Sequence, residues 1–223
     1  MIIDDGSVAE LVRRWEPGWG RCRGLAAAVD TGVALRVPVA AANRHEEIFA
    51  LHADEHPESL AELAKLVISA GPLTWLTTMT TRPHVTREVL EAAGLTVFGD
   101  PETFMTTDLI GHPHHEARPP YSVRVIETDG VWHARLSTEN GTTAASGMTA
   151  VIGRDAVAHE IRTDPDHRRR GLGSVVMSAL TDAAVRAGAR TGLLIASPDG
   201  ERLYRRLGWT PRATVLTAKA ARR

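Results

Sequence analysis

Four segments between residues 122 and 163 alternate apolar and polar side chains with the period of two that marks half-buried strands. Short turns rich in Gly, Asp and Asn separate them, at residues 128–130, 139–141 and 153–155. Such turns are typical of β-hairpins, in which consecutive strands pair antiparallel. The sequence therefore predicts an antiparallel meander. Its strands are expected at residues 122–127, 131–137, 142–152 and 156–163.

The apolar period changes after Gly173. Val176, Leu180 and Ala183 fall on one face of a helix, and Gly188 is of the residue type that often ends one. A loop from strand to helix thus lies at the end of the meander. The rest of the chain predicts a strand, a short helix and a final strand, at residues 193–196, 200–207 and 214–217.

The first half of the chain also alternates helices and strands. Ser7 is suited to cap a helix over 7–15, which Pro17-Gly18 is expected to end. The order strand, helix, glycine, strand occurs in both halves, and it fits either an internal duplication or the common order of elements in α/β proteins. The later elements expected here are a strand at 33–39, a helix at 57–69, a strand at 73–79, a helix at 85–93 and a closing strand pair at 95–98 and 104–109.

Composition and charge exclude several classes of protein. Of the 223 residues, 43% are apolar and 24% charged, which is ordinary for one large globular domain or two small ones. The net charge of -1 gives no general attraction to nucleic acid or anionic membranes. Cys22 is the only cysteine, which excludes an intrachain disulfide. Because Asp4 and Asp5 stand where a signal peptide carries cations, and no apolar run reaches membrane-spanning length, we expect a soluble cytoplasmic protein.

The segment 164–173 joins a predicted strand to a predicted helix. Gly171 and Gly173 have no side chain to keep a ligand from the backbone, and amides of the first helical turn are free to bind an anion. The helix dipole adds about 0.3 to 1 kcal/mol, and three arginines at 168–170 add positive charge. A diphosphate suits this loop better than a carboxylate, and a solvated basic turn is the alternative.

This loop resembles a motif of the GNAT acetyltransferase superfamily. The family has Arg/Gln-x-x-Gly-x-Gly/Ala after its fourth strand, often with a proline upstream. Arg168, Gly171 and Gly173 match the motif, and Pro165 matches the proline.

A second family segment is matched further along the chain. The family pattern Asn-x-x-Ala-x-x-Leu-Tyr-x-x-x-Gly-Phe resembles residues 197–209, where Ser197 replaces the usual Asn and Trp209 replaces Phe. Two motifs in the correct order and spacing are far more specific than either alone. The resemblance covers residues 122–217.

The resemblance implies an acyl-CoA-dependent N-acyltransferase, first of all an N-acetyltransferase that uses acetyl-CoA. It implies an α/β fold with a mixed, mostly antiparallel central sheet flanked by helices. Backbone groups of Ile161 and Thr163 would pair with the pantetheine arm like an added strand, and the loop amides would hold the diphosphate. The expected cofactor-binding residues are Ile161, Arg162, Thr163, Arg168, Arg169, Arg170, Gly171, Leu172, Gly173, Ser174 and Ser197.

The expected organisation has two halves. Residues 1–110 form an α/β amino-terminal half, degenerate GNAT-like if the halves are a duplication, 111–120 a linker and 121–223 the GNAT domain. The family normally has two helices between its first two strands, where this chain has only 128–130. Either the amino-terminal half supplies the missing wall of the acceptor cleft, or the cleft is unusually open. The expected partners are an acyl-CoA and an amine of a small molecule or protein, without nucleic acid or membrane, in a monomer or homodimer.

Acyl transfer from a thioester to an amine needs a proton acceptor for the amine and a proton donor for the leaving thiolate. Tyr204 matches the tyrosine acid of the family, and a tyrosine that only fills the core is the alternative. His159 lies nine residues before Arg168, where arylalkylamine N-acetyltransferases of this superfamily place a histidine implicated in amine deprotonation. The ordinary histidine pKa of about 6.5 suits proton transfer at physiological pH. Glu160, on the opposite face of the strand, and a chain of waters are the alternatives.

Other candidates have weaker support. His112, His114 and His115 lie in a proline-rich segment that indicates a solvated linker rather than a metal site, because only Glu116 accompanies them. Cys22 lacks a paired base for covalent catalysis. The proposed chemistry needs no metal. A non-catalytic acyl-CoA-binding module is the second functional hypothesis, and a nucleic-acid-binding domain ranks last because aromatic residues total only 4%.

Overall fold

The computed structural model describes residues 6–221, which form two halves of similar composition in strands and helices. The first half contains α1 (Val8–Cys22), β1 (Val29–Asp30), β2 (Ala34–Ala41), β3 (Arg44–Ala50), α2 (Pro57–Ala70), β4 (Thr74–Thr80), α3 (Pro83–Ala92) and β5 (Leu95–Asp108). The second half contains β6 (Tyr121–Thr128), β7 (Val131–Thr138), β8 (Thr143–Ile152), β9 (Asp155–Thr163), the 3₁₀ turn η1 (Pro165–His167), α4 (Leu172–Arg186), β10 (Thr191–Ala196), α5 (Pro198–Arg206) and β11 (Thr210–Ala220).

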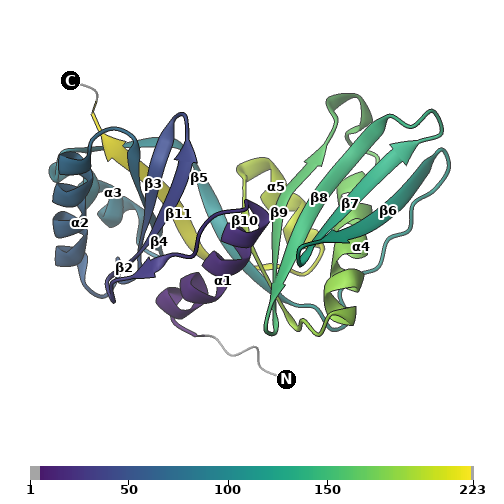
Figure 1. Ribbon diagram of the computed structural model, residues 1–223, viewed down its shortest axis with the longest axis horizontal. Helices are drawn as coiled ribbons and strands as arrows, with labels where there is room; N and C mark the ends of the chain where they lie inside the picture. Colours follow the sequence, from purple (N-terminus) through teal and green to yellow (C-terminus); the bar gives the residue numbers. More distant parts are fainter. Residues whose placement is uncertain (1–5, 222–223) are drawn as a thin grey trace.

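All strands belong to one continuous sheet (Figure 1). Its eleven strands follow the order β1-β2-β3-β4-β11-β5-β10-β9-β8-β7-β6. The helices α2, α3, α4 and α5 pack on one face of the sheet, and α1 packs on the other. This arrangement confirms the expected mixed, mostly antiparallel sheet flanked by helices, including the meander of β6 to β9.

The two halves exchange their last strands. β5 ends the first half but pairs with β10 of the second, from Thr103↔Ala196 to Asp108↔Thr191. β11 ends the second half but pairs with β4 of the first, and β5 and β11 also pair with each other. The order of elements is thus repeated, as β3-α2-β4-α3-β5 and β9-α4-β10-α5-β11. We propose that residues 1–110 and 121–223 are two halves of one folding unit, joined by the segment 111–120.

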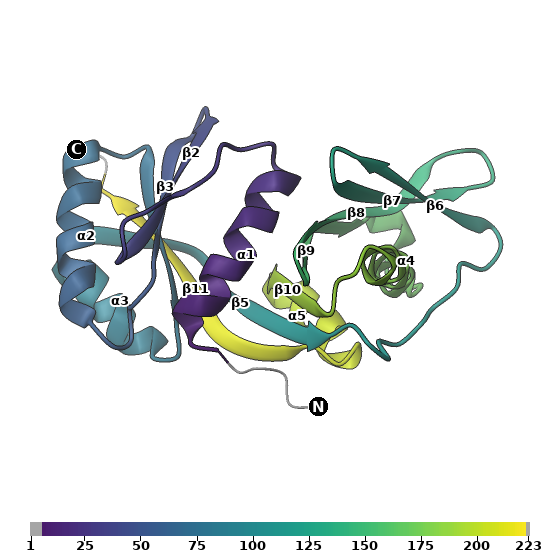
Figure 2. The same ribbon diagram turned by 60° about the horizontal axis from the view of Figure 1, so that its bottom comes forward.

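The helix α1 fills the face of the sheet where the halves meet (Figure 2). The predicted stop at Pro17-Gly18 is wrong, because the helix continues to Cys22. Proline removes only one helical hydrogen bond, and beyond it Trp19 stacks on Trp15 in the core, with ring centroids 5.4 Å apart. Glycine at position 18 permits a close approach to β9, since a Cβ there would lie 2.4 Å from Cγ2 of Val157.

Two further predictions about the first half are corrected. β5 is one strand, with no break between residues 98 and 104, because β11 adapts to it by a shift of register between Val215 and Thr217. β3 was not predicted, since two adjacent glutamates interrupt its apolar pattern. One of them, Glu47, is buried in an ion pair with Arg44 and accepts a hydrogen bond from Thr77 at 2.6 Å. Among residues 6–221, no helix has both the length and the apolar character that crossing a membrane requires.

Candidate functional site

The strands β9 and β10 separate before either strand ends. They are parallel and pair from Asp155↔Thr191 to Val157↔Leu193, after which each continues with no further pairing to the other in the described chain. Both strands run toward the same edge of the sheet, so the gap opens where the loop 164–171 and the start of α5 lie. The corresponding strands of the first half, β3 and β4, stay paired as far as Ala50↔Thr78. The second half therefore has an open strand edge that the first half lacks.

The loop before α4 presents free backbone amides. Gly171 caps α4 in a left-handed conformation, with φ of 75°, and Arg169 also has a positive φ. The first amide bonded in helical fashion is that of Ser174, 3.0 Å from the carbonyl oxygen of Gly171. The preceding amides, from Arg169 to Gly173, donate to no acceptor within residues 6–221. Consecutive free amides at a helix N-terminus form an anion-binding site.

The three arginines of this loop are exposed but differ in their partners. Arg170 is held in place: Nη1 donates to the hydroxyl of Tyr121 at 2.7 Å, and Nη2 donates to the carbonyl oxygen of Asp166 at 3.2 Å. Arg168 reaches back to the carbonyl oxygen of Thr163 at 3.4 Å. The Arg169 side chain has no hydrogen-bond partner in the described part of the chain. Positive charge therefore surrounds the free amides without being neutralised by a carboxylate.

The predicted residues of β9 lie beside the gap. Ile161 is half-buried against α4. It also lies close to Gly147 of β8, where a Cβ would lie 2.4 Å from Cδ1 of Ile161. Arg162 is exposed and pairs with Glu160 at 3.0 Å. The backbone of this part of β9 is the edge against which the pantetheine arm is expected to pair.

The start of α5 completes the same edge of the sheet. Ser197 follows β10 directly and caps α5, because its hydroxyl accepts a hydrogen bond from the amide of Gly200 at 3.2 Å. Gly173 of α4 packs against α5, where a Cβ would lie 2.9 Å from Cδ2 of Leu203. Leu172, beside it, is a core residue with only 5% of its surface exposed. Gly173 therefore lies between Thr163 and α5, the helix that Ser197 caps.

Tyr204 lies on the α5 side of the sheet. It is 7% exposed, in an apolar cluster with Met177, Leu194 and Trp209, against which Ala158 of β9 packs. Its hydroxyl has no hydrogen-bond partner among the described residues. Burial raises the pKa of the phenol well above its ordinary value, so the hydroxyl is protonated at physiological pH. Its environment suits both core packing and proton donation.

His159 lies on the opposite face, toward α1. Val157, two residues earlier on β9, belongs to the apolar cluster under α1, and alternate residues of a strand share a face. Burial lowers the pKa of His159 to about 4; Glu160 opposes this shift, and Arg23 and Arg162 add to it. Its Nε2 is buried without a partner among residues 6–221. The expected titration near pH 6.5 is therefore corrected: the imidazole is neutral at physiological pH.

The amino-terminal half supplies the wall on this side of the site. Arg14 of α1 holds the start of β9 through two hydrogen bonds to Asp155, at 3.0 and 2.6 Å. Arg23, which ends α1, lies within electrostatic range of His159 and stacks on Trp19 at 5.3 Å. No sequence motif indicates that Arg23 lies near the site. Its position could have been inferred only by predicting that α1 continues through Pro17. The helix α1 of the first half thus covers the face of β9 that carries His159.

Cys22 is a poor nucleophile in this structure. Its Sγ lies 3.8 Å from the carbonyl oxygen of Val157, and burial raises the pKa of the thiol to about 12. A protonated thiol neither attacks a thioester nor binds a metal well. The flanking arginines do not overcome the effect of burial.

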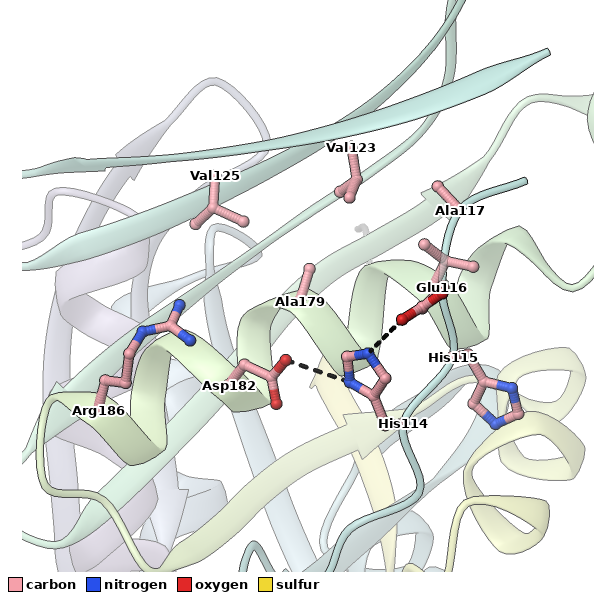
Figure 3. A pocket seen from close by; sticks show the side chains of 10 residues that line it. His114, His115, Glu116, Ala117, Val123, Val125, Ala179, Asp182 and Arg186 are labelled. Carbon is pink, nitrogen blue, oxygen red and sulfur yellow. Dashed lines mark ion pairs between the residues drawn. The ribbon is translucent and has the colours of Figure 1, made fainter. Parts of the chain in front are cut away.

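The histidine-rich segment is largely exposed, and it lies along α4, where the amide of His115 donates a hydrogen bond to the hydroxyl of Ser178 at 2.9 Å. A cavity of about 390 Å³ lies between this segment, β6 and α4 (Figure 3). There Nδ1 of His114 lies 3.2 Å from the carboxylate of Asp182, and Nε2 lies 3.9 Å from Glu116. No residue of the loop 164–171, β9 or β10 lines the cavity. Within residues 6–221, no group of three or more His, Cys, Asp or Glu side chains is arranged to hold a metal ion.

Comparisons with known proteins identify the family of this region. The acetyltransferase (GNAT) domain family matches residues 127–211. The ribosomal protein bS18 alanine N-acetyltransferase of Escherichia coli (strain K12) is 33% identical over 91 residues, which cover 39% of this chain and 62% of that protein. The match therefore spans less than two thirds of the length of that relative.

Solved structures share the fold over most of the chain. A GCN5-related N-acetyltransferase from Kribbella flavida has a TM-score of 0.71 at 18% identity, covering 98% of this chain and 97% of that one. A tandem GNAT protein from the clavulanic acid biosynthesis pathway has a TM-score of 0.57 at 15% identity, covering 87% and 82%. Both likenesses show the fold, and the family match is confined to residues 127–211. Residues 127–211 therefore match the acetyltransferase (GNAT) domain family, and the chain shares its fold with solved N-acetyltransferases.

Proposed function

We propose that this protein is an N-acetyltransferase that moves an acetyl or other short acyl group from acyl-CoA to an amine. The observation that carries the proposal is the gap between β9 and β10, with the free amides of residues 169–173 at its edge. The unpaired edge of β9 offers backbone partners to the amides of a pantetheine arm, and the loop offers donors to a diphosphate. The proposal includes a cytoplasmic location for this activity.

The reaction is a direct attack of the amine on the thioester. The amine nitrogen forms a bond to the carbonyl carbon, the carbon–sulfur bond breaks, and the products are an amide and the CoA thiol. Tyr204, from the α5 side, donates a proton to the sulfur. His159, from the α1 side, accepts the proton of the amine, directly or through water. Because the pKa of His159 is about 4, it accepts this proton only as the carbon–nitrogen bond forms and the nitrogen becomes acidic.

Substitution in the glycine loop is expected to weaken acetyl-CoA binding at least about tenfold without unfolding the protein. Gly171→Val puts a β-branched residue at a φ of 75°, and Gly173→Val pushes on Leu203, so both displace the free amides. Thermal stabilisation by acetyl-CoA measures the effect, since a ligand at 100 times its Kd adds about 2.7 kcal/mol.

The control for the glycine variants is Gly153→Val. Gly153 also has a positive φ, 59°, but lies in the β8–β9 turn, at the opposite end of β9 from the loop. This variant should lose stability while binding acetyl-CoA normally. If both loop variants keep the full stabilisation by acetyl-CoA, the site is wrong. Release of CoA thiol with a panel of primary amines tests turnover, and acetyl-CoA binding without release for any amine would contradict acyl transfer.

His159→Gln is expected to lower kcat about tenfold at pH 7, with partial recovery at pH 9. The lowered pKa of His159 keeps the imidazole in its basic form between about pH 6 and 9, so the titration of His159 itself does not change the wild-type rate in this range. Recovery at high pH is expected because more of the amine is then deprotonated in solution. Equal rates for wild type and variant at pH 7 would transfer the role of base to Glu160 or water.

A further inference from the structure

Glu102 of β5 is a half-buried carboxylate without a partner. It forms no hydrogen bond and no ion pair with any residue between 6 and 221. Burial raises its pKa, and the carboxylate of Glu47 raises it further. Removing a charge from water without a partner destabilises a protein, and such groups are enriched at functional sites. No motif in the sequence marks this residue.

Strand pairing places Glu102 on the same face of the sheet as His159. Glu102 lies directly opposite Val215 of β11, and residues directly opposite each other share a face. Val215 belongs to the apolar cluster under α1, as does Phe104, two residues after Glu102 on β5. His159 lies on this face too, because it is two residues after Val157 of the same cluster.

Glu102 and His159 lie on opposite sides of the gap in which the thioester is proposed to lie. β10 is the strand between β5 and β9, so Glu102 and His159 lie two strands apart, on either side of the end of β10. Thr103 pairs with Ala196, the last residue of β10, so Glu102 lies just beyond the end of that strand. An amine that attacks in the gap therefore passes between a carboxylate and an imidazole.

Three other carboxylates near this site are already engaged. Glu47 pairs with Arg44 and accepts from Thr77, and Glu160 pairs with Arg162. Glu201 lies near Glu102 in space, because it accepts a hydrogen bond from Thr103 at 2.6 Å, but it also pairs with Arg205. Glu102 is thus the carboxylate of this group that has no cation or hydroxyl beside it in the described chain.

We propose that Glu102 binds the ammonium group of the acceptor opposite His159, so that the acceptor is a cationic amine held by residues of both halves. The inference rests on the proposed acyl transfer. The ammonium binds in its protonated form and loses one proton to water before its nitrogen attacks, and His159 accepts the second proton as the carbon–nitrogen bond forms. A carboxylate at this position favours aliphatic amines, which are protonated at neutral pH, over aromatic amines, which are neutral.

The test compares Glu102→Gln with wild type in acetyl transfer from acetyl-CoA to primary alkylamines such as 2-phenylethylamine, with aniline as the neutral probe. With the best alkylamine of the panel, the KM for the amine should rise at least about tenfold in the variant, while the KM for acetyl-CoA stays within about twofold. The preference for alkylamine over aniline should fall by a similar factor. Glu102→Asp, which keeps the charge, should restore part of the loss.

Glu201→Gln is the matched control, because it neutralises the neighbouring carboxylate on the opposite face of β5. Its KM for the amine should stay within about twofold of wild type. Melting temperatures should show Glu102→Gln to be at least as stable as wild type, since the change removes a charge without a partner. An unchanged KM for the amine in a folded, active Glu102→Gln overturns the proposal and leaves acyl transfer standing. Absence of turnover in the wild type with every amine overturns both.

Discussion

Tyr204→Phe should lower the rate of acetyl transfer at saturating substrates by at least tenfold, within reach of the ~10² to 10⁴ that general acid catalysis contributes. The phenylalanine ring keeps the contacts with the apolar cluster around Trp209, so stability and acetyl-CoA affinity should change little. Only the hydroxyl is lost, and with it the proton for the leaving sulfur. The measurements are kcat from thiol release and Kd from thermal stabilisation.

Tyr121→Phe provides the comparison for Tyr204→Phe, because it removes the hydroxyl of the other tyrosine of the sequence. That hydroxyl accepts a hydrogen bond from Arg170 at 2.7 Å and lies 3.0 Å from Nδ1 of His167. Its loss should free Arg170 and weaken acetyl-CoA binding, with kcat nearly unchanged. If Tyr204→Phe turns over at the wild-type rate with normal stability, Tyr204 is a packing residue and water protonates the thiolate.

The fragment 118–223 is expected to give no cooperative unfolding transition and no acetyl transfer. It contains β11 but neither β4 nor β5, the strands with which β11 pairs. It also leaves β10 unpaired on the side that β5 covers, and exposes the apolar residues that α1 buries. Open strand edges and exposed apolar surface lead to aggregation rather than a stable domain. Light scattering and a thermal melt measure the outcome.

A complementation experiment controls for damage caused by the cut itself. Residues 1–117 produced as a separate chain alongside 118–223 supply β4, β5 and α1, and should restore solubility and turnover. The cut falls in the exposed segment before the strand β6, away from the sheet pairings. A soluble 118–223 that unfolds cooperatively and transfers acetyl groups on its own would show that the first half is dispensable.

Patterns that are local in the sequence predicted the structure well. The meander needs only alternation and turns, and α2 needs only an apolar face between Pro57 and Gly71, so both were confirmed with shifts of at most one residue at their ends. The glycine loop is also local, because a strand, two glycines and a helix lie within one stretch of chain. The proposed site for the diphosphate could therefore be predicted without knowledge of the rest of the fold.

Features that depend on distant segments could not be predicted. The helix α1 continues past Pro17 because Trp19 finds a core made by Phe49 and Trp15, and β5 passes through residues 99–101 because β11 adapts to it. The pKa of His159 follows from burial under α1, more than 130 residues earlier in the sequence. Glu102 lies beside the gap because the two halves exchange their last strands, and no local pattern in the sequence predicts that exchange.

The exchange of last strands also determines when the protein can fold during synthesis. Thr78 of β4 donates a hydrogen bond to the carbonyl oxygen of Leu216, 138 residues later in the chain. At 5–20 residues per second, the ribosome needs about 10 s to make that partner after β4 has emerged. During this interval β11, the strand between β4 and β5, has not been made. The first half therefore stays incompletely folded, alone or bound to chaperones, until the rest of the chain is synthesised. Premature termination before Thr210 would consequently leave both halves with unpaired strands, and a nonsense mutation there should be as damaging as one near the start of the gene.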